Sequence, residues 1–234
     1  MAWLQTHQTS RWVFRGEPKC QTSLRPAIGR GGNWNADREF LLYEMFAHRS
    51  RLFRPNTLKM SFIEEVAWAQ HHGLPTRLLD WTTNPLAATY FAVQSPRAGD
   101  VIVHSVDAPE VGFHSDFELD SADTTRIVTE TKFIETAPLS PRIAAQRGLF
   151  SLHHDPMKNW KPKGRDKDND CFTIESGARS YFLSRLNQLG LDASTVMTDL
   201  DGLCASLRWW YQSGLQTPST IGRRVKTVSF RSKV

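Results

Sequence analysis

One stretch in the first half of the chain restricts the fold most, because its start and stop signals fix the order of three elements. Ser61 followed by Glu64 forms a capping box, which predicts a helix over 62–72 that ends at a glycine followed by a proline. The next residues, TRLLDWT at 76–82, are rich in β-formers and predict a strand. An asparagine cap and a proline in the first turn predict a further helix over 85–93.

The rest of the chain alternates short strands and helices without a regular βαβ order. Predicted strands span 12–16, 101–106, 149–153 and 171–175, and predicted helices span 37–47, 176–189 and 201–211. This mixture predicts an α+β class. We expect a single globular domain over 10–211, followed by a tail over 212–234.

Composition excludes several other classes of protein. With 40% hydrophobic residues, eight Trp and thirteen Phe, the 234-residue chain can form a core and is not disordered as a whole. The longest apolar stretch is short of the ~20 residues that cross a bilayer, and no secretory signal is visible. Cys20, Cys171 and Cys204 form no CxxC pair, so we expect reduced thiols, a cytoplasmic protein and no metal.

The positive charge is concentrated at the C-terminus. The chain carries +5, and six basic residues with no acid lie from Gly202 onward, so subtracting these six leaves −1 on the rest. Five of them follow the last predicted helix: Arg223, Arg224, Lys226, Arg231 and Lys233. This tail is predicted to bind RNA phosphates or the acidic surface of an antitoxin or chaperone; the alternative is a solvated terminus.

A first candidate site is Arg15, which is followed by Gly16 and is expected at the end of the first strand. An Arg fork can hold a phosphate or carboxylate through two hydrogen bonds, and glycine lets a ligand approach the backbone. The alternative is that Arg15 pairs with a surface acid such as Glu17.

A second candidate combines several polar residue types within 70–82. His71, His72, Arg77, Asp80 and Thr82 all lie in this stretch, together with a tryptophan. Adjacent histidines diverge by about 100° on a helix, so they would not chelate one metal as an i, i+4 pair does. The stretch is either a helix C-cap with one histidine bonded to the backbone or a loop that lines a ligand.

A third candidate is Gln146, which stands among small residues just before a predicted strand. It could face a pocket, or it could be a buried amide bonded to backbone. No Walker loop, GxGxxG, GxSxG or HExxH motif is present to name a function directly.

Taken together, these motifs resemble the FRG domain family of bacterial and phage-related proteins over roughly residues 10–210. The resemblance rests on Trp12–Gly16, the 70–82 stretch, Asn84-Pro85 and Gln146-x-Gly148. It implies an ADP-ribosyltransferase-like fold, in which split mixed or antiparallel sheets are flanked by helices.

The resemblance also implies an activity: an NAD-dependent ADP-ribosyltransferase toxin that modifies RNA or another nucleic acid in anti-phage defence or a toxin–antitoxin system. The residues expected to bind NAD are Arg15, Gly16, Arg77, Asp80 and Thr82. Gln146 is the expected catalytic residue, although transferases usually carry Glu there, so His71 or His72 would activate the acceptor. The alternative is a non-catalytic module that binds nucleotide or nucleic acid.

Overall fold

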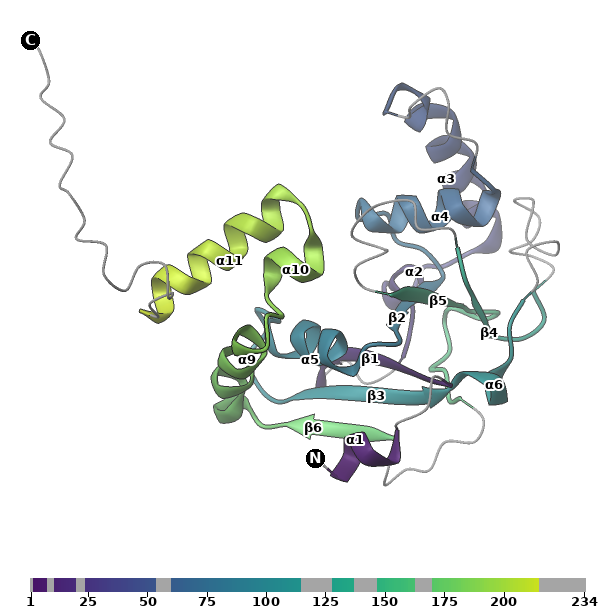
Figure 1. Ribbon diagram of the computed structural model, residues 1–234. Helices are drawn as coiled ribbons and strands as arrows, with labels where there is room; N and C mark the ends of the chain where they lie inside the picture. Colours follow the sequence, from purple (N-terminus) through teal and green to yellow (C-terminus); the bar gives the residue numbers. More distant parts are fainter. Residues whose placement is uncertain are drawn as a thin grey trace, which may run out of the picture.

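The computed structural model describes residues 2–7, 11–19, 24–53, 60–114, 128–136, 147–162 and 170–214, and within them the predicted α+β class is confirmed (Figure 1). The strands are β1 (Trp12–Pro18), β2 (Leu78–Thr82), β3 (Val101–Asp107), β4 (Lys132–Ile134), β5 (Gly148–Leu152) and β6 (Cys171–Ile174). The helices are α1 (Ala2–Thr6), α2 (Ala27–Arg30), α3 (Ala36–Arg49), η2 (Ser50–Phe53), α4 (Phe62–His71), α5 (Pro85–Val93), α6 (Ala108–Val111), η4 (Ser176–Ala178), α9 (Arg179–Gln188), α10 (Ala193–Met197) and α11 (Leu200–Ser213).

These strands form one sheet in the order β4-β5-β2-β1-β3-β6, with every strand pairing antiparallel. Its two halves, β4-β5-β2 and β1-β3-β6, meet at a single residue pair, Phe14 opposite Thr82. By contrast, β1 pairs with β3 along all of Trp12–Pro18, and β2 pairs with β5 along all of Leu78–Thr82. The pairing between neighbouring strands is therefore shortest at the centre of the sheet, between β1 and β2.

The local signals around α4, β2 and α5 act as the sequence indicates. Ser61 and Glu64 form both hydrogen bonds of the capping box at the start of α4. Gly73, just past its end, has φ +91°, a conformation that side chains with a Cβ rarely adopt. The Asn84 side chain accepts hydrogen bonds from the backbone N–H groups of Leu86 and Ala87 at the start of α5.

Each half of the sheet buries one face under its own helices. On the β1-β3-β6 half, Phe14, Val101 and Val103 pack with the alanines of α5 and with Leu186 of α9. On the β4-β5-β2 half, an apolar cluster joins β2 and β5 to α3 and α4: Tyr43, Ile63, Val66, Leu78, Phe150 and Leu152. The helices of the two halves thus flank the narrow centre from either side.

The opposite face of the sheet is covered by α6 and by irregular chain. Its apolar residues come from both halves: Val13, Leu79, Trp81, Val106, Phe133 and Leu149. Leu24 packs in this cluster and Trp160 lies against it, with its ring centroid 5.9 Å from that of Trp81.

The structure extends two predicted boundaries. β1 continues past Gly16 to Pro18 because Glu17 and Pro18 pair with β3, so Arg15 lies inside the strand and not at its end. Before β1, the ring of Trp3 in α1 contacts Phe14 and Phe172, so residues ahead of the expected domain start also pack on the sheet. Across the described ranges, no helix is long and apolar enough to cross a membrane.

Candidate functional site

A cleft of about 350 Å³ opens where β1 and β2 part. Its lining comes from both strands, the end of α4 and one side of α5: Phe14, Arg15, Gly16, Gln70, His71, Asp80, Trp81, Thr82, Ala88 and Phe91. The volume lies at the lower end of the ~300–1,000 Å³ typical of small-ligand sites. Five of the residues singled out in the sequence therefore share one cavity, although more than forty residues separate β1 from α4 along the chain.

Arg15 bridges the two strands at the base of this cleft. Its Nη1 donates a hydrogen bond of 2.8 Å to the backbone carbonyl of Asp80, across the point where β1 and β2 separate. Its Nε lies 3.5 Å from Glu17 Oε2 without hydrogen-bond geometry, so this buried donor has no hydrogen-bond partner within the described residues. Arg15 does pair with Glu17, but that acid is 3% exposed and not at the surface as expected.

The carboxylate of Asp80 is held in place yet open to solvent. Its Oδ1 accepts a hydrogen bond of 2.8 Å from Gln70 Nε2, and Gln70 Oε1 in turn accepts from the Thr76 hydroxyl. The other oxygen lies 3.8 Å from Arg15 Nη1, and the side chain is 66% exposed. Gln70 was not among the predicted site residues. The sequence feature that points to it is its position at the end of α4, next to His71.

The two adjacent histidines separate as expected for a helix end. His71 is partly buried and lines the cleft. His72 is exposed, and its ring packs edge-on against Trp68 and His71 at centroid distances of 5.4 and 5.1 Å. Only His71 is therefore placed to meet a ligand in the cleft.

Gly16 and Thr82 shape the cleft through the backbone. A Cβ on Gly16 would stand 1.9 Å from the carbonyl oxygen of Ala88, so glycine permits α5 to lie directly on β1. The buried Thr82 hydroxyl accepts a hydrogen bond of 2.9 Å from the backbone N–H of Asn84, the residue that caps α5. Both residues fix α5 beside the cleft.

Arg77 lies away from the cleft, in a buried ion pair. It is 1% exposed, its Nε donates to Glu39 Oε1 at 2.7 Å, and its Nη2 bonds the other oxygen of the same carboxylate. The hydroxyl of Tyr43 also donates to Glu39, and burial, followed by the nearby Glu39 charge, raises the pKa of Tyr43. This position does not support the predicted contact between Arg77 and NAD; the pair ties α3 to the start of β2.

Gln146 and the basic tail residues Arg223, Arg224, Lys226, Arg231 and Lys233 lie outside the described residues. The first described residues after Gln146 do border the cleft: Gly148, where β5 begins, stands opposite Thr82. A small adjoining cavity of about 40 Å³ is lined by Gly148 together with His71 and Asp80.

Among the described residues, no group of three or more His, Cys, Asp or Glu side chains is placed to hold a metal ion.

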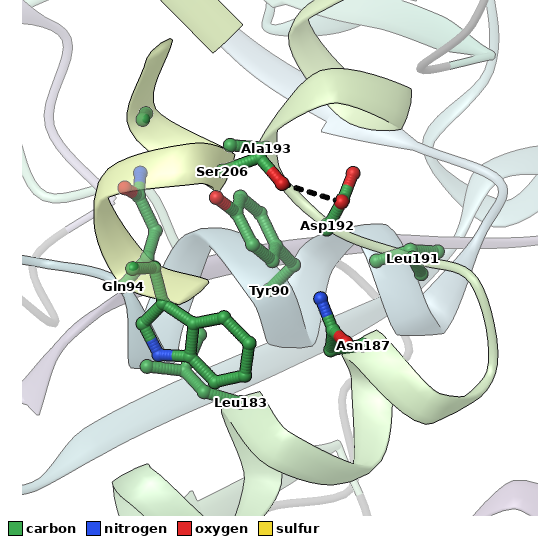
Figure 2. A pocket seen from close by; sticks show the side chains of 10 residues that line it. Tyr90, Gln94, Leu183, Asn187, Leu191, Asp192, Ala193 and Ser206 are labelled. Atoms are coloured by element: carbon green, nitrogen blue, oxygen red, sulfur yellow. Dashed lines mark hydrogen bonds between the residues drawn. The ribbon is translucent and has the colours of Figure 1, made fainter. Parts of the chain in front are cut away.

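A second cavity, of about 170 Å³, lies between α5, α9, α10 and α11 (Figure 2). Its acidic residue is Asp192, which accepts hydrogen bonds from the Ser206 hydroxyl at 2.6 Å and from the Ser194 hydroxyl at 2.7 Å. Burial opposes ionisation, but these bonds outweigh it and lower the pKa of Asp192. Because the carboxylate is committed to capping α10, this cavity offers a ligand less than the central cleft does.

The fold and the cleft define an α+β protein with a polar cleft between β1 and β2, near the centre of an antiparallel sheet. Residues 10–101 match the family model of the FRG domain, which confirms the predicted resemblance over this part of the chain. The match includes every residue that lines the central cleft. No curated protein and no solved structure matches the chain.

Proposed function

We propose that the central cleft binds NAD and that the protein is an NAD-dependent ADP-ribosyltransferase acting on RNA or another nucleic acid. The observation that carries the proposal is the pairing of Arg15 at the base of the cleft with the exposed carboxylate of Asp80 above it. A cation can bind the diphosphate of NAD, and a carboxylate can act at its ribose.

The reaction breaks the bond between the ribose C1 and the nicotinamide nitrogen through an oxocarbenium-like state, as in glycoside cleavage. Nicotinamide leaves with the bonding electrons, and a hydroxyl or amine of the acceptor forms the new bond to C1. A carboxylate stabilises the developing positive charge or takes the acceptor proton. Asp80 can supply this group in the cleft, with His71 as a second proton acceptor and Gln146 as a proposed contact to the ribose hydroxyls.

Arg15 suits the diphosphate because its guanidinium keeps donors that no described residue uses. Nη1 is spent on the Asp80 carbonyl, whereas the buried Nε donates to no described acceptor. A diphosphate in the cleft would accept hydrogen bonds from the guanidinium and neutralise the cation. Glu17 and Asp80, at 3.5 and 3.8 Å, hold the guanidinium in place until a ligand arrives.

The decisive experiment incubates the protein with adenylate-labelled NAD and cellular RNA, and follows both nicotinamide release and label on RNA. Asp80→Asn is expected to lower both by at least ~100-fold, the range of a lost acid–base group. Glu175→Gln, at an exposed acid after β6 and outside the cleft, is the matched control and is expected to behave like wild type. NAD binding without nicotinamide release would support the alternative, a non-catalytic module that binds nucleotide or nucleic acid. Absence of NAD binding would refute the transferase and leave only a module that binds nucleic acid or another nucleotide.

The basic tail is proposed to hold the RNA acceptor, in a toxin that works in the cytoplasm as part of anti-phage defence or a toxin–antitoxin pair. Removing residues 215–234 leaves α11 intact and takes away five of the six C-terminal cations. RNA binding should weaken and its dependence on salt should flatten, while NAD hydrolysis stays unchanged. If RNA binding is unaffected but an acidic partner protein no longer binds, the tail serves an antitoxin or chaperone instead.

A further inference from the structure

A cysteine, a histidine and a glutamate lie in a row on three neighbouring strands, on the sheet face opposite α5. Cys171 of β6 is directly opposite His104 of β3, and His104 is directly opposite Arg15 of β1. Glu17 follows two residues after Arg15 and therefore points to the same face. The register of the sheet thus brings together three residues that are far apart in the chain.

The distances within this row are those of a hydrogen-bonded relay. Cys171 Sγ lies 3.4 Å from His104 Nδ1, and His104 Nε2 lies 3.1 Å from Glu17 Oε1. An ionised carboxylate only accepts hydrogen bonds, so Nε2 carries the proton and Nδ1 presents its lone pair to the thiol. A nucleophile beside a base that a third group orients is the arrangement that activates thiols in proteins.

The hydrogen bonds of His104 to Cys171 and Glu17 favour a thiolate–imidazolium pair. His104 is 1% exposed and Glu17 3%, so both are shielded from water, while Cys171 is partly exposed. Burial opposes the charged form of His104, but its hydrogen bonds to Cys171 and Glu17 outweigh that effect and raise its pKa. Two cations, Arg15 and Arg30 of α2, interact electrostatically with Glu17 at one end of the row. At the other end, the buried Asp170 precedes Cys171 in the chain.

We propose that Cys171, His104 and Glu17 form an activated-thiol site beside the NAD cleft, joined to it by the contact between Glu17 and Arg15, that reacts with small electrophiles and in particular with peroxides. His104 Nδ1 takes the thiol proton, and Glu17 is a positioning residue that stabilises the imidazolium. The thiolate then attacks one oxygen of the peroxide, a sulfur–oxygen bond forms, and the oxygen–oxygen bond breaks. Sulfur is oxidised to a sulfenic acid, the peroxide is reduced, and the leaving oxygen takes up a proton to become water or an alcohol.

The test measures alkylation by iodoacetamide at each cysteine of the full chain between pH 5.5 and 9.5, by peptide mass spectrometry. Each rate is divided by its own plateau at high pH, which cancels differences in exposure. An ordinary thiol keeps about 1% of its plateau rate at pH 6.5, whereas a thiol activated by a histidine keeps above about 20%. Cys204, exposed on α11 and not hydrogen-bonded to any described histidine, serves as the internal comparison.

The expected result is that Cys171 exceeds Cys204 by at least about 20-fold in this normalised rate at pH 6.5. His104→Gln should move the Cys171 profile to that of an ordinary thiol, and Glu17→Gln should move it partway. Exposure to hydrogen peroxide at pH 6.5 should then give sulfenic acid at Cys171 before Cys204. If the wild-type profiles of the two cysteines coincide, the proposal is wrong, and this result does not depend on how the variants fold.

Discussion

Replacing Gly16 with alanine tests how tightly β1 and α5 are joined beside the cleft. The added Cβ would stand 1.9 Å from the Ala88 carbonyl oxygen, 2.8 Å from Ala92 N and 2.9 Å from the Ala88 carbonyl carbon. Real Cβ contacts essentially never fall below 3.0 Å, so the oxygen must retreat by at least about 1.1 Å. All three atoms are backbone, so no side-chain rotation can relieve the clash, and α5 itself must move.

The cost follows from what α5 covers. Ala88 and Ala92 are 1% and 0% exposed and belong to the cluster around Phe14, so moving the helix loosens that packing. Overpacking a close-packed core typically costs about 1–3 kcal/mol, and a clash of this depth against backbone should cost about 3 kcal/mol or more. For a chain of this size, that lowers the melting temperature by about 6–12 °C.

Urea unfolding followed by tryptophan fluorescence measures this change directly. Gly31→Ala is the matched control, because nothing lies within 4 Å of its added Cβ and its φ of −78° suits alanine. Gly31→Ala should leave stability unchanged or raise it by up to about 1 kcal/mol. Equal unfolding midpoints for the two variants would refute the view that Gly16 is needed for the contact between β1 and α5.

Three further predictions address Arg77, His153 and Arg15. Arg77→Met should lower the free energy of unfolding in urea by about 3–5 kcal/mol, because it leaves the buried Glu39 carboxylate without its cation, and the added change Glu39→Leu should restore part of that stability. A variant Arg77→Met that stays stable but loses NAD binding would instead favour a role for Arg77 in the cleft. Burial, followed by the charges of Arg15 and Arg77, lowers the pKa of His153 from 6.5 to about 3, so the unfolded state binds more protons between these values and stability falls as the pH falls. Between pH 7 and pH 5, the free energy of unfolding of the wild type should fall by up to about 1.4 kcal/mol per pH unit more than that of His153→Gln. Equal pH dependence of the two proteins would contradict the lowered pKa of His153. Arg15→Ala should weaken NAD binding about 10- to 150-fold in calorimetry, and Arg15→Lys should restore little because Lys lacks the planar fork.

The elements that the sequence predicts well are those with local signals. Ser61, Glu64 and Asn84 act on backbone groups two or three residues away, so their effect does not depend on the rest of the fold. The short helix α10 begins with a local capping box of Asp192 and Thr195 that the predicted elements leave out. The short elements β4 and α6 carry no such pattern. Their positions come from contacts with distant parts of the chain, as when β4 pairs with β5.

The same limit applies to two residues near the site. Arg77 was expected in a ligand site because charged residues are costly to bury, but its compensating acid, Glu39, lies 38 positions away on α3. Glu17 entered only the alternative interpretation of Arg15, as a surface acid, and the pairing of β1 with β3 is what places it beside His104. A sequence shows which polar residues are present, whereas burial and partners depend on pairings that no local pattern encodes.

The four residues Phe14–Glu17 show how one short motif meets two demands. Alternation along β1 directs Phe14 and Gly16 to α5, where one fills the core and the other leaves room for the helix backbone. It directs Arg15 and Glu17 to the opposite face, where the Arg15 guanidinium enters the gap between β1 and β2 and Glu17 reaches His104. Substitutions at the first pair should therefore act through stability, and substitutions at the second pair through the chemistry of the cleft and of the thiol row.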